Sequence, residues 1–344
     1  MAPLRATTVN DNPSAVASAP AEVLRSIAET TGRVRAALGK VIVGQQAVVD
    51  DLLVSLLTGG HVLLEGVPGL AKTTLVSVLA SAAGLEHARI QFTPDLLPGD
   101  ILGSEVLEEN RETGERQFRY VQGPVFTQVL LADEINRTPP KTQAALLQAM
   151  QEKKVSYMGK TYPLPFPFAV YATQNPIENE GTYPLPEAQL DRFMLKVVVD
   201  YPSEAEERSI ALINPRSLAE GVGNVVGEIP WRAWYDFLDS MPLAASLVEL
   251  SVRLVRASRP EQSGADDFVR KNVRWGAGPR ASQHLLQACR GRAALEGLAA
   301  PTLDHLKKAA YGVLRHRIIP SFSAEAGRIR PEAIIAHLIE KTLV

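Results

Sequence analysis

The loop Gly66–Thr73 contains the residue types that bind phosphate. It follows an apolar run and precedes a helical pattern, so its backbone N–H groups and the positive end of the helix dipole would face an anion. The Lys72 ammonium would neutralise the β- and γ-phosphates, and the Thr73 hydroxyl would bind Mg²⁺. The residues expected to contact the nucleotide here are Gly66, Val67, Pro68, Gly69, Leu70, Ala71, Lys72, Thr73 and Thr74.

Position 71 departs from the usual pattern GxxxxGK[ST], because alanine replaces the second glycine. Alanine is expected to fit only if its φ stays negative, as in a first helical turn, since an L side chain disfavours positive φ. The alternative interpretation of this segment is a Gly/Pro turn between a strand and a helix, followed by an accidental Lys-Thr pair.

Two adjacent carboxylates, Asp133 and Glu134, follow the apolar run VLLA. Ligands of open α/β sheets bind at the carboxyl ends of the strands, which is where this pair would lie. Asp133 would hold Mg²⁺ through water, and Glu134 would activate an attacking water as general base. Acid pairs also occur at strand ends as solvated caps, but a phosphate loop earlier in the chain favours the catalytic interpretation.

Two further polar residues adjoin predicted strands. Asn175 follows FAVYATQ and would orient the attacking water, although an asparagine before Pro176 also suits a turn. Arg192 precedes the last apolar run, and a guanidinium there would stabilise charge on a transferring phosphoryl group. An ion pair of Arg192 with Asp191 or Glu187 is the alternative, which periodicity alone cannot separate.

The C-terminal part contributes fewer candidates. Arg280 begins a predicted helix after GAGP and would link the C-terminal part to the γ-phosphate. The alternative is that Gly and Pro here only mark the start of a helix, as they commonly do. For Arg315 and Arg317 in LRHRI, a solvated helical face is favoured over contacts at a subunit interface. Cys289 lies in an apolar helical pattern and is expected in the core.

The elements that position these residues follow from periodicity. Short, almost continuously apolar runs alternate with helical patterns, which predicts a parallel α/β sheet covered by helices. A helical pattern over 21–57 is interrupted at 39–44, and hairpins are predicted near 101–121, around Gly114, and at 153–163, around Gly159. The predicted strands are 61–65, 88–92, 129–133, 168–173 and 194–200, and the intervening helices include 73–83 and 141–151.

Length, net charge and cysteine count limit the number of domains, the classes of partner and the location of the protein. A chain of 344 residues predicts two domains, an α/β core at 21–202 and a helical domain at 203–344, preceded by a disordered leader at 1–20. The net charge of −2 argues against a broad nucleic-acid surface, although Lys153, Lys154 and Lys160 leave a local one open. One cysteine excludes an internal disulfide, and no apolar run suits a membrane span, so a cytoplasmic location is expected.

Together the segments LEGVPGLAKT, FTPDLLPGD, LLADEINR, ATQNP and YPLPEAQLDRF resemble the MoxR family of AAA+ ATPases. The resemblance implies a five-stranded parallel sheet of order 5-1-4-3-2 and a C-terminal all-α lid. It identifies 66–73 as Walker A, Asp133 and Glu134 as Walker B, and Asn175 as sensor 1. It also identifies Arg192 as the arginine finger and Arg280 as sensor 2, and it places Val43, Gly44 and Gln45 against adenine.

The resemblance also implies a function. Such proteins bind ATP/ADP with Mg²⁺ in a ring, usually a hexamer, and remodel or activate a client protein or assist metal insertion. Their partner often carries a von Willebrand A domain. Two alternatives are a slowly hydrolysing, nucleotide-gated binding scaffold and a motor subunit like that of magnesium chelatase. The client and the ring size are not encoded in any motif of the sequence.

Overall fold

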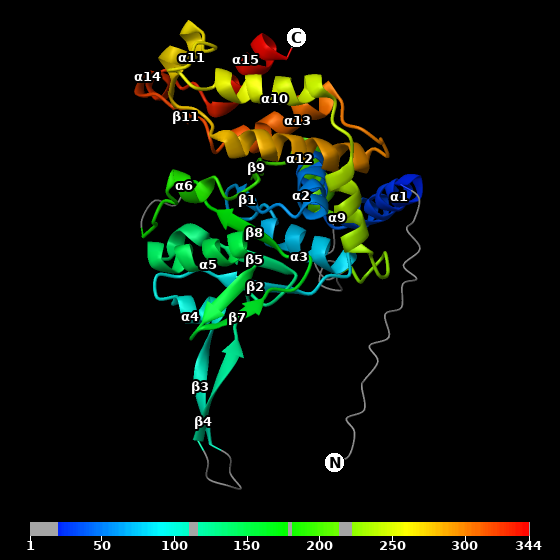
Figure 1. Cartoon of the computed structure of the whole chain (residues 1–344), viewed down its shortest axis with the longest axis vertical. Coiled ribbons are helices and arrows are strands. Elements are labelled where there is room, and N and C mark those ends of the chain that lie inside the picture. Colours follow the sequence, from blue (N-terminus) through cyan, green and yellow to red (C-terminus); the bar gives the residue numbers. More distant parts are fainter. Residues whose placement is uncertain (1–19, 110–115, 178–180, 213–221, 344) are drawn as a thin grey trace, which may run out of the picture.

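The structure, a computed structural model, describes residues 20–109, 116–177, 181–212 and 222–343. A five-stranded parallel sheet lies at its centre, and its strands follow the spatial order β2-β5-β8-β1-β9 (Figure 1). Numbered along the chain, this order is 5-1-4-3-2, which confirms the expected topology. The strands are β1 (Val62–Glu65), β2 (His87–Gln91), β5 (Val129–Asp133), β8 (Ala169–Gln174) and β9 (Leu195–Val198).

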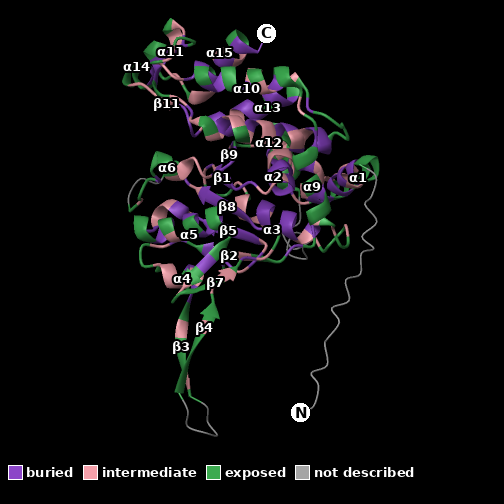
Figure 2. Ribbon diagram, in the orientation of Figure 1, coloured by how far each residue is buried: buried purple, intermediate pink, exposed green. Residues whose placement is uncertain are grey.

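Both faces of the sheet are covered. In β5, Leu131 packs into one apolar cluster while its neighbours Leu130 and Ala132 pack into another, and the interior of the sheet is buried (Figure 2). Burial on both faces explains why these strands are continuously apolar in the sequence. The first cluster includes residues of α1 (Pro20–Leu38), α2 (Gln46–Thr58) and α3 (Lys72–Ala82), and the second residues of α4 (Pro98–Leu102) and α5 (Pro140–Glu152).

Two antiparallel hairpins interrupt the α/β alternation, as the sequence predicted. The longer one, β3 (Gly103–Glu109) with β4 (Arg116–Gln122), projects from the body of the molecule (Figure 1). The shorter pairs β6 (Lys154–Tyr157) with β7 (Lys160–Pro163) and turns through Gly159 at φ 75°. The Tyr120 ring stacks on those of Tyr157 and Tyr162, which joins the hairpins. The predicted turn around Gly114 lies outside the described residues.

Helices predominate after β9. They are α7 (Glu204–Ala211), α9 (Trp231–Ser240), α10 (Ala245–Ala257), α11 (Asp267–Asn272), α12 (Pro279–Leu295), α13 (Leu303–Leu314), α14 (Phe322–Ala326) and α15 (Pro331–Thr342). The short helix α6 (Glu187–Leu190) precedes β9. Buried apolar residues of α9 to α13 and of α15 join the cluster that covers one face of the sheet. Where α13 crosses β9, a Cβ atom on Gly312 would lie 3.1 Å from Leu195 Cδ2, so the small residue allows close packing.

The C-terminal region is helical, as expected, with one addition that the sequence did not predict. Two short antiparallel strands, β10 (Val273–Trp275) and β11 (Ile319–Pro320), pair within the helical region. Strands of two or three residues are too short to produce a period-two pattern, so the sequence contains no signal for them. The Ser321 N–H also donates to Asn272 O, which extends the contact between these two segments.

Several single-residue expectations concern the core. Cys289 is fully buried, as predicted, and burial raises the pKa of its thiol to about 12. His61 is also buried: its Nδ1 accepts from Val170 N, its Nε2 donates to Met150 O, and burial lowers its pKa to about 4. None of the helices within the described residues has the length and apolarity to cross a bilayer. The predicted leader lies outside the described residues except for Pro20.

Candidate functional site

The loop between β1 and α3 forms one wall of a cavity of about 450 Å³ at the carboxyl ends of the central strands. Gly66 passes close to β9, where a Cβ atom would lie only 2.6 Å from Val199 O. Glycine is therefore required for the loop to leave the sheet in this direction. The cavity is lined by Pro68, Gly69, Leu70, Ala71, Lys72, Thr73, Thr74, Asp133, Glu134, Thr173, Gln174 and Asn175.

Ala71 corrects the expectation that alanine requires negative φ here. It lies in the left-handed region, with φ 55° and ψ 23°, immediately before the first residue of α3. This conformation costs about 1–2 kcal/mol in an L residue. Backbone strain of this kind persists where the surrounding structure imposes it, typically at binding loops. The helix therefore begins one residue later than a right-handed Ala71 would allow.

Lys72 is the first residue of α3 and bends back over the loop. Its Nζ donates to Gly66 O at 2.5 Å and to Val67 O at 2.8 Å. Partial burial lowers its pKa, while the carboxylates of Asp133 and Glu134 act in the opposite direction. The ammonium thus lies between the loop and the acid pair, where it can neutralise an anion.

Asp133 ends β5 and is buried. Its Oδ1 accepts from Thr173 Oγ1 at 2.5 Å, and its Oδ2 lies 3.4 Å from Thr73 Oγ1. A carboxylate beside a hydroxyl at the start of a helix is a donor set that suits Mg²⁺, which prefers oxygen ligands and retains waters. The side chains therefore fit the metal predicted from the sequence.

Arg89 occupies the other side of this carboxylate. Its Nη2 and Nε lie 2.7 and 3.2 Å from Asp133 Oδ2, and Nη2 also donates to Gln91 Oε1 at 2.8 Å. Gln91 Nε2 in turn donates to Glu134 Oε2 at 2.8 Å. One hydrogen-bonded chain on β2 thus connects the two acids.

Glu134 has an unusual backbone. Its φ is 57°, and its N–H donates to Thr173 Oγ1 at 2.9 Å. Its carboxylate is also paired with Arg137 Nε at 3.1 Å. The left-handed turn directs the side chain out of the strand and into the cavity lining, beside the candidate metal ligand.

Arg89, Gln91 and Thr173 belong to none of the motifs recognised in the sequence. A signal was available, because Arg89 and Gln91 alternate within ARIQF and so share one side of a predicted strand. Their significance depends on β2 pairing with β5, which places Gln91 opposite Asp133. Strand order is a tertiary property, so the alternation alone did not indicate a partner.

Asn175 combines the two interpretations that the sequence left open. Its Oδ1 accepts from Ile177 N at 3.3 Å, which is the turn-forming contact. Its Nδ2 is buried and has no hydrogen-bond partner among the described residues, although it belongs to the cavity lining. A buried donor without a partner costs free energy, so its presence here points to a ligand that accepts a hydrogen bond.

The segment Val43–Gln45 lies beside α7 and outside the lining of the 450 Å³ cavity, the candidate phosphate cavity. Gly44 has φ 70°, and a Cβ atom there would lie 2.0 Å from Glu206 Oε1. Gln45 follows in the same left-handed region, and its Oε1 is buried without a partner among the described residues. This segment can therefore offer a hydrogen-bond acceptor to a bound group.

Arg192 and Arg280 do not line the phosphate cavity of their own chain. Arg192 Nη1 donates to Leu147 O at 2.6 Å, beside a separate cavity of about 370 Å³ against α5. Arg280 Nη1 pairs with Asp191 Oδ2 at 3.0 Å. The alternative of an ion pair between Arg192 and Asp191 is not what the structure shows, because that carboxylate is bound by other arginines.

The favoured solvated face for Arg315 and Arg317 is wrong. Arg317 is 5% exposed and hydrogen-bonds to the core segment around Asp191. Arg315 pairs with Glu332 and donates to Lys196 O at 2.8 Å. Both side chains connect the helical region to the sheet, a role that helical periodicity cannot distinguish from solvent exposure.

Comparisons with known proteins agree with this geometry. A model of the ATPase family associated with various cellular activities matches residues 61–195, and an AAA lid domain model matches residues 265–338. The chain is 43% identical over 330 residues to Chaperone MoxR1 of Mycobacterium tuberculosis, covering 93% of this chain and 84% of that protein. It is 34% identical to Protein MoxR of Paracoccus denitrificans, covering 89% and 92%.

A crystal structure from Cytophaga hutchinsonii has a similar fold. It superposes with a TM-score of 0.81 at 39% sequence identity, covering 93% of this chain and 96% of that one. The similarity therefore extends over both the sheet and the helices that follow it.

Proposed function

The chain belongs to the MoxR family of AAA+ ATPases, and from this premise we propose that it binds and hydrolyses ATP in a hexameric ring. The energy would serve to remodel, assemble or activate a client protein, in the manner of a chaperone. A partner with a von Willebrand A domain, a role in metal or cofactor insertion and a cytoplasmic location belong to the same proposal. Nucleic acid is not part of it, given the net charge of −2.

One observation carries this proposal. A single cavity contains an ammonium, a hydroxyl, two carboxylates and the amide donor of Asn175, which has no partner among the described residues. Lys72 and the loop N–H groups would hold the phosphates, while Val43–Gln45 would contact adenine. Glu134 would take a proton from the attacking water, which Asn175 would orient. Mg²⁺, held by Thr73 and Asp133, would neutralise charge that develops on the phosphate oxygens.

The positions of Arg192 and Arg280 support the proposal of a ring. A phosphoryl transfer site needs a cation for charge that develops in the transition state, and an arginine supplied by a neighbouring chain is one solution. Arg192 lies outside its own chain's cavity, so it is assigned to the nucleotide of the neighbouring subunit. Arg280, which pairs with Asp191 in this structure, would link the helical region to the γ-phosphate as sensor 2. Hydrolysis would then depend on assembly.

Two alternatives use the same site. A nucleotide-gated scaffold would hydrolyse slowly and recruit a partner, and stimulation of turnover by a client or partner would argue against it. A magnesium-chelatase-like motor subunit would act in metal insertion, and the metal content of client proteins in cells lacking the chain would reveal it. The cavity itself favours neither, because both would bind the same nucleotide.

The variant Lys72→Ala tests nucleotide binding directly. Loss of a hydrogen-bonded charge of this kind is worth about 1.5–3 kcal/mol, so ATP affinity should fall by about 10- to 100-fold. Isothermal titration with ATP and Mg²⁺ measures it, with the exposed Lys341→Ala as the control that should bind normally. If Lys72→Ala bound ATP like the parent, the cavity would not be the nucleotide site.

The Arg89–Asp133 ion pair leads to a second prediction. The guanidinium and a divalent cation would compete for the same carboxylate, so Arg89→Met should lower the Mg²⁺ concentration needed for half-maximal ATP binding. The arginine side chain is 53% exposed, which limits the pair to about 0.2–1 kcal/mol and the shift to at most about fivefold. A Mg²⁺ titration of ATP binding measures this concentration, with Arg116→Met as the control. A higher Mg²⁺ concentration for half-maximal binding in Arg89→Met would contradict the prediction.

A further inference from the structure

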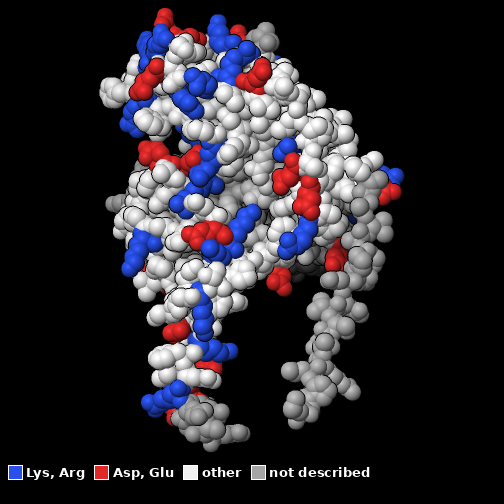
Figure 3. All heavy atoms as spheres, in the orientation of Figure 1, with Lys and Arg blue, Asp and Glu red and all other residues white. Residues whose placement is uncertain are grey.

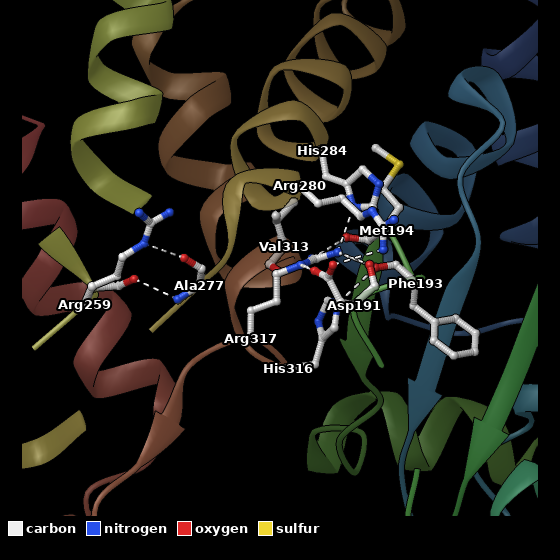
Figure 4. A network of polar contacts seen from close by, with 11 residues as sticks. Asp191, Phe193, Met194, Arg259, Ala277, Arg280, His284, Val313, His316 and Arg317 are labelled. Atoms are coloured by element: carbon white, nitrogen blue, oxygen red, sulfur yellow. Dashed lines mark hydrogen bonds and ion pairs between the residues drawn. The ribbon is translucent and has the colours of Figure 1, made fainter. Parts of the chain in front are cut away.

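A buried arginine from the helical region penetrates the sheet domain at the segment Asp191–Met194. Arg317, which follows α13, donates through Nε to Asp191 Oδ1 at 2.7 Å. Its two Nη atoms donate to Asp191 O, Phe193 O and Met194 O at 3.0, 2.7 and 3.2 Å (Figure 4). The guanidinium therefore holds the backbone of this segment as well as its carboxylate.

A second arginine binds the same carboxylate. Arg280, at the start of α12, lies 3.0 Å from Asp191 Oδ2, so the two carboxylate oxygens are each bound by a different lid residue. His284 Nδ1 accepts from Arg317 Nη2 at 2.7 Å, and burial lowers the pKa of this histidine to about 3, which keeps it neutral and able to accept. Asp191 is thus a core residue that two arginines of the lid bind together (Figure 4).

Asp191 is covalently adjacent to Arg192. The short helix α6 ends at Leu190, and the Phe193 side chain is fully buried, so the chain is fixed on both sides of the arginine. Arg192 itself is only partly buried and points to the cavity against α5. Its position depends on the backbone that the lid arginines hold.

A cavity lies beside the contacts that Arg317 makes with Asp191. Arg274 and Trp275 of β10 border a cavity of about 640 Å³, which Asp191 and Arg317 also line. In the space-filling view, this junction between the upper helical region and the sheet domain is hollowed (Figure 3). Unfilled space at the junction leaves room for the helices to shift relative to the segment that bears Arg192.

We propose that Asp191 is a positioning residue through which the lid of one subunit sets Arg192 for the nucleotide of its neighbour. The inference rests on the proposed function, in which Arg192 acts across the subunit interface. It adds that the lid, through Arg317 and Arg280, determines whether that arginine is presented. Arg192 would contact the substrate, whereas Asp191 would act only through it.

Mixed rings test the proposal. A donor subunit carries Lys72→Ala, which weakens its own ATP binding but keeps Arg192, and a receiver carries Arg192→Ala but keeps its phosphate cavity. ATP turnover should return on mixing, because receiver cavities then face donor arginines. Adding Asp191→Asn to the donor should lower this restored turnover by about 10- to 100-fold, the usual effect of a misplaced catalytic group. Adding it to the receiver should leave turnover nearly unchanged.

Comparing Asp191→Asn in the donor with Asp191→Asn in the receiver separates a positioning effect from a loss of stability. A general loss of fold would reduce turnover equally from either subunit and would overturn the proposal, as would no loss from the donor. Asp191→Glu in the donor, which retains the charge, should recover part of the turnover. If the unmodified donor and receiver failed to restore any turnover while each still assembled, the trans role of Arg192 would itself be refuted, and this inference with it.

Discussion

Replacing Arg192 with alanine is expected to reduce ATP turnover by about 10³- to 10⁵-fold while leaving ATP affinity nearly intact. The guanidinium contributes nothing to the phosphate cavity of its own chain, where its side chain instead contacts Leu147 O. Its effect should therefore fall on the transition state at the neighbouring site and not on ground-state binding. Phosphate release and calorimetric ATP binding, measured on the same preparation, give the two quantities.

The exposed Arg270 on α11 provides a matched control for this loss of charge. Arg270→Ala should hydrolyse ATP at the parental rate. Loss of ATP affinity in Arg192→Ala would show that the arginine serves its own chain's site, contrary to the proposal.

Replacing Glu134 with glutamine should reduce turnover by about 10²- to 10⁴-fold, the contribution typical of a general base. The substitution is isosteric and keeps an oxygen for the hydrogen bond from Gln91 Nε2, so the local geometry should persist. ATP binding should remain, because the phosphate loop and Asp133 are unchanged. The protein should then accumulate in its ATP-bound ring, visible by size-exclusion chromatography in ATP.

Glu325→Gln, on the surface of α14, is the control and should not change turnover. Normal hydrolysis by Glu134→Gln would remove this residue as the base. The ATP-bound variant also provides a way to capture the client, because a ring that cannot hydrolyse ATP should retain what it engages.

Much of the architecture could be predicted from local patterns. The strands that end at Asp133 and precede Asn175 are covered on both faces, so their apolar runs were continuous and easily distinguished from the amphipathic helices. The candidate phosphate loop Gly66–Thr73, which follows β1, could also be found from the sequence, because residue type and spacing identify it. The resemblance to the MoxR family added the strand order, which the pattern itself does not contain.

The backbone conformation of single residues was harder to predict from the sequence. Alanine at position 71 was expected to keep negative φ on intrinsic preference, yet it adopts φ 55°. Intrinsic preference is worth only about 1–2 kcal/mol, which the packing of the loop between β1 and α3 outweighs. The short strands β10 and β11 could not be predicted either, because each pairs with a segment that is distant in the sequence.

The identity and sequence position of the phosphate loop, the acid pair and the core strands were determined by the sequence alone, because each depends on residues that are neighbours along the chain. The partners of charged side chains were decided only by the tertiary structure. Arg317 resembles a solvated helical residue until the chain folds and brings Asp191 within 2.7 Å. Charge attraction acts through space, so no periodicity along the chain records which carboxylate an arginine will meet.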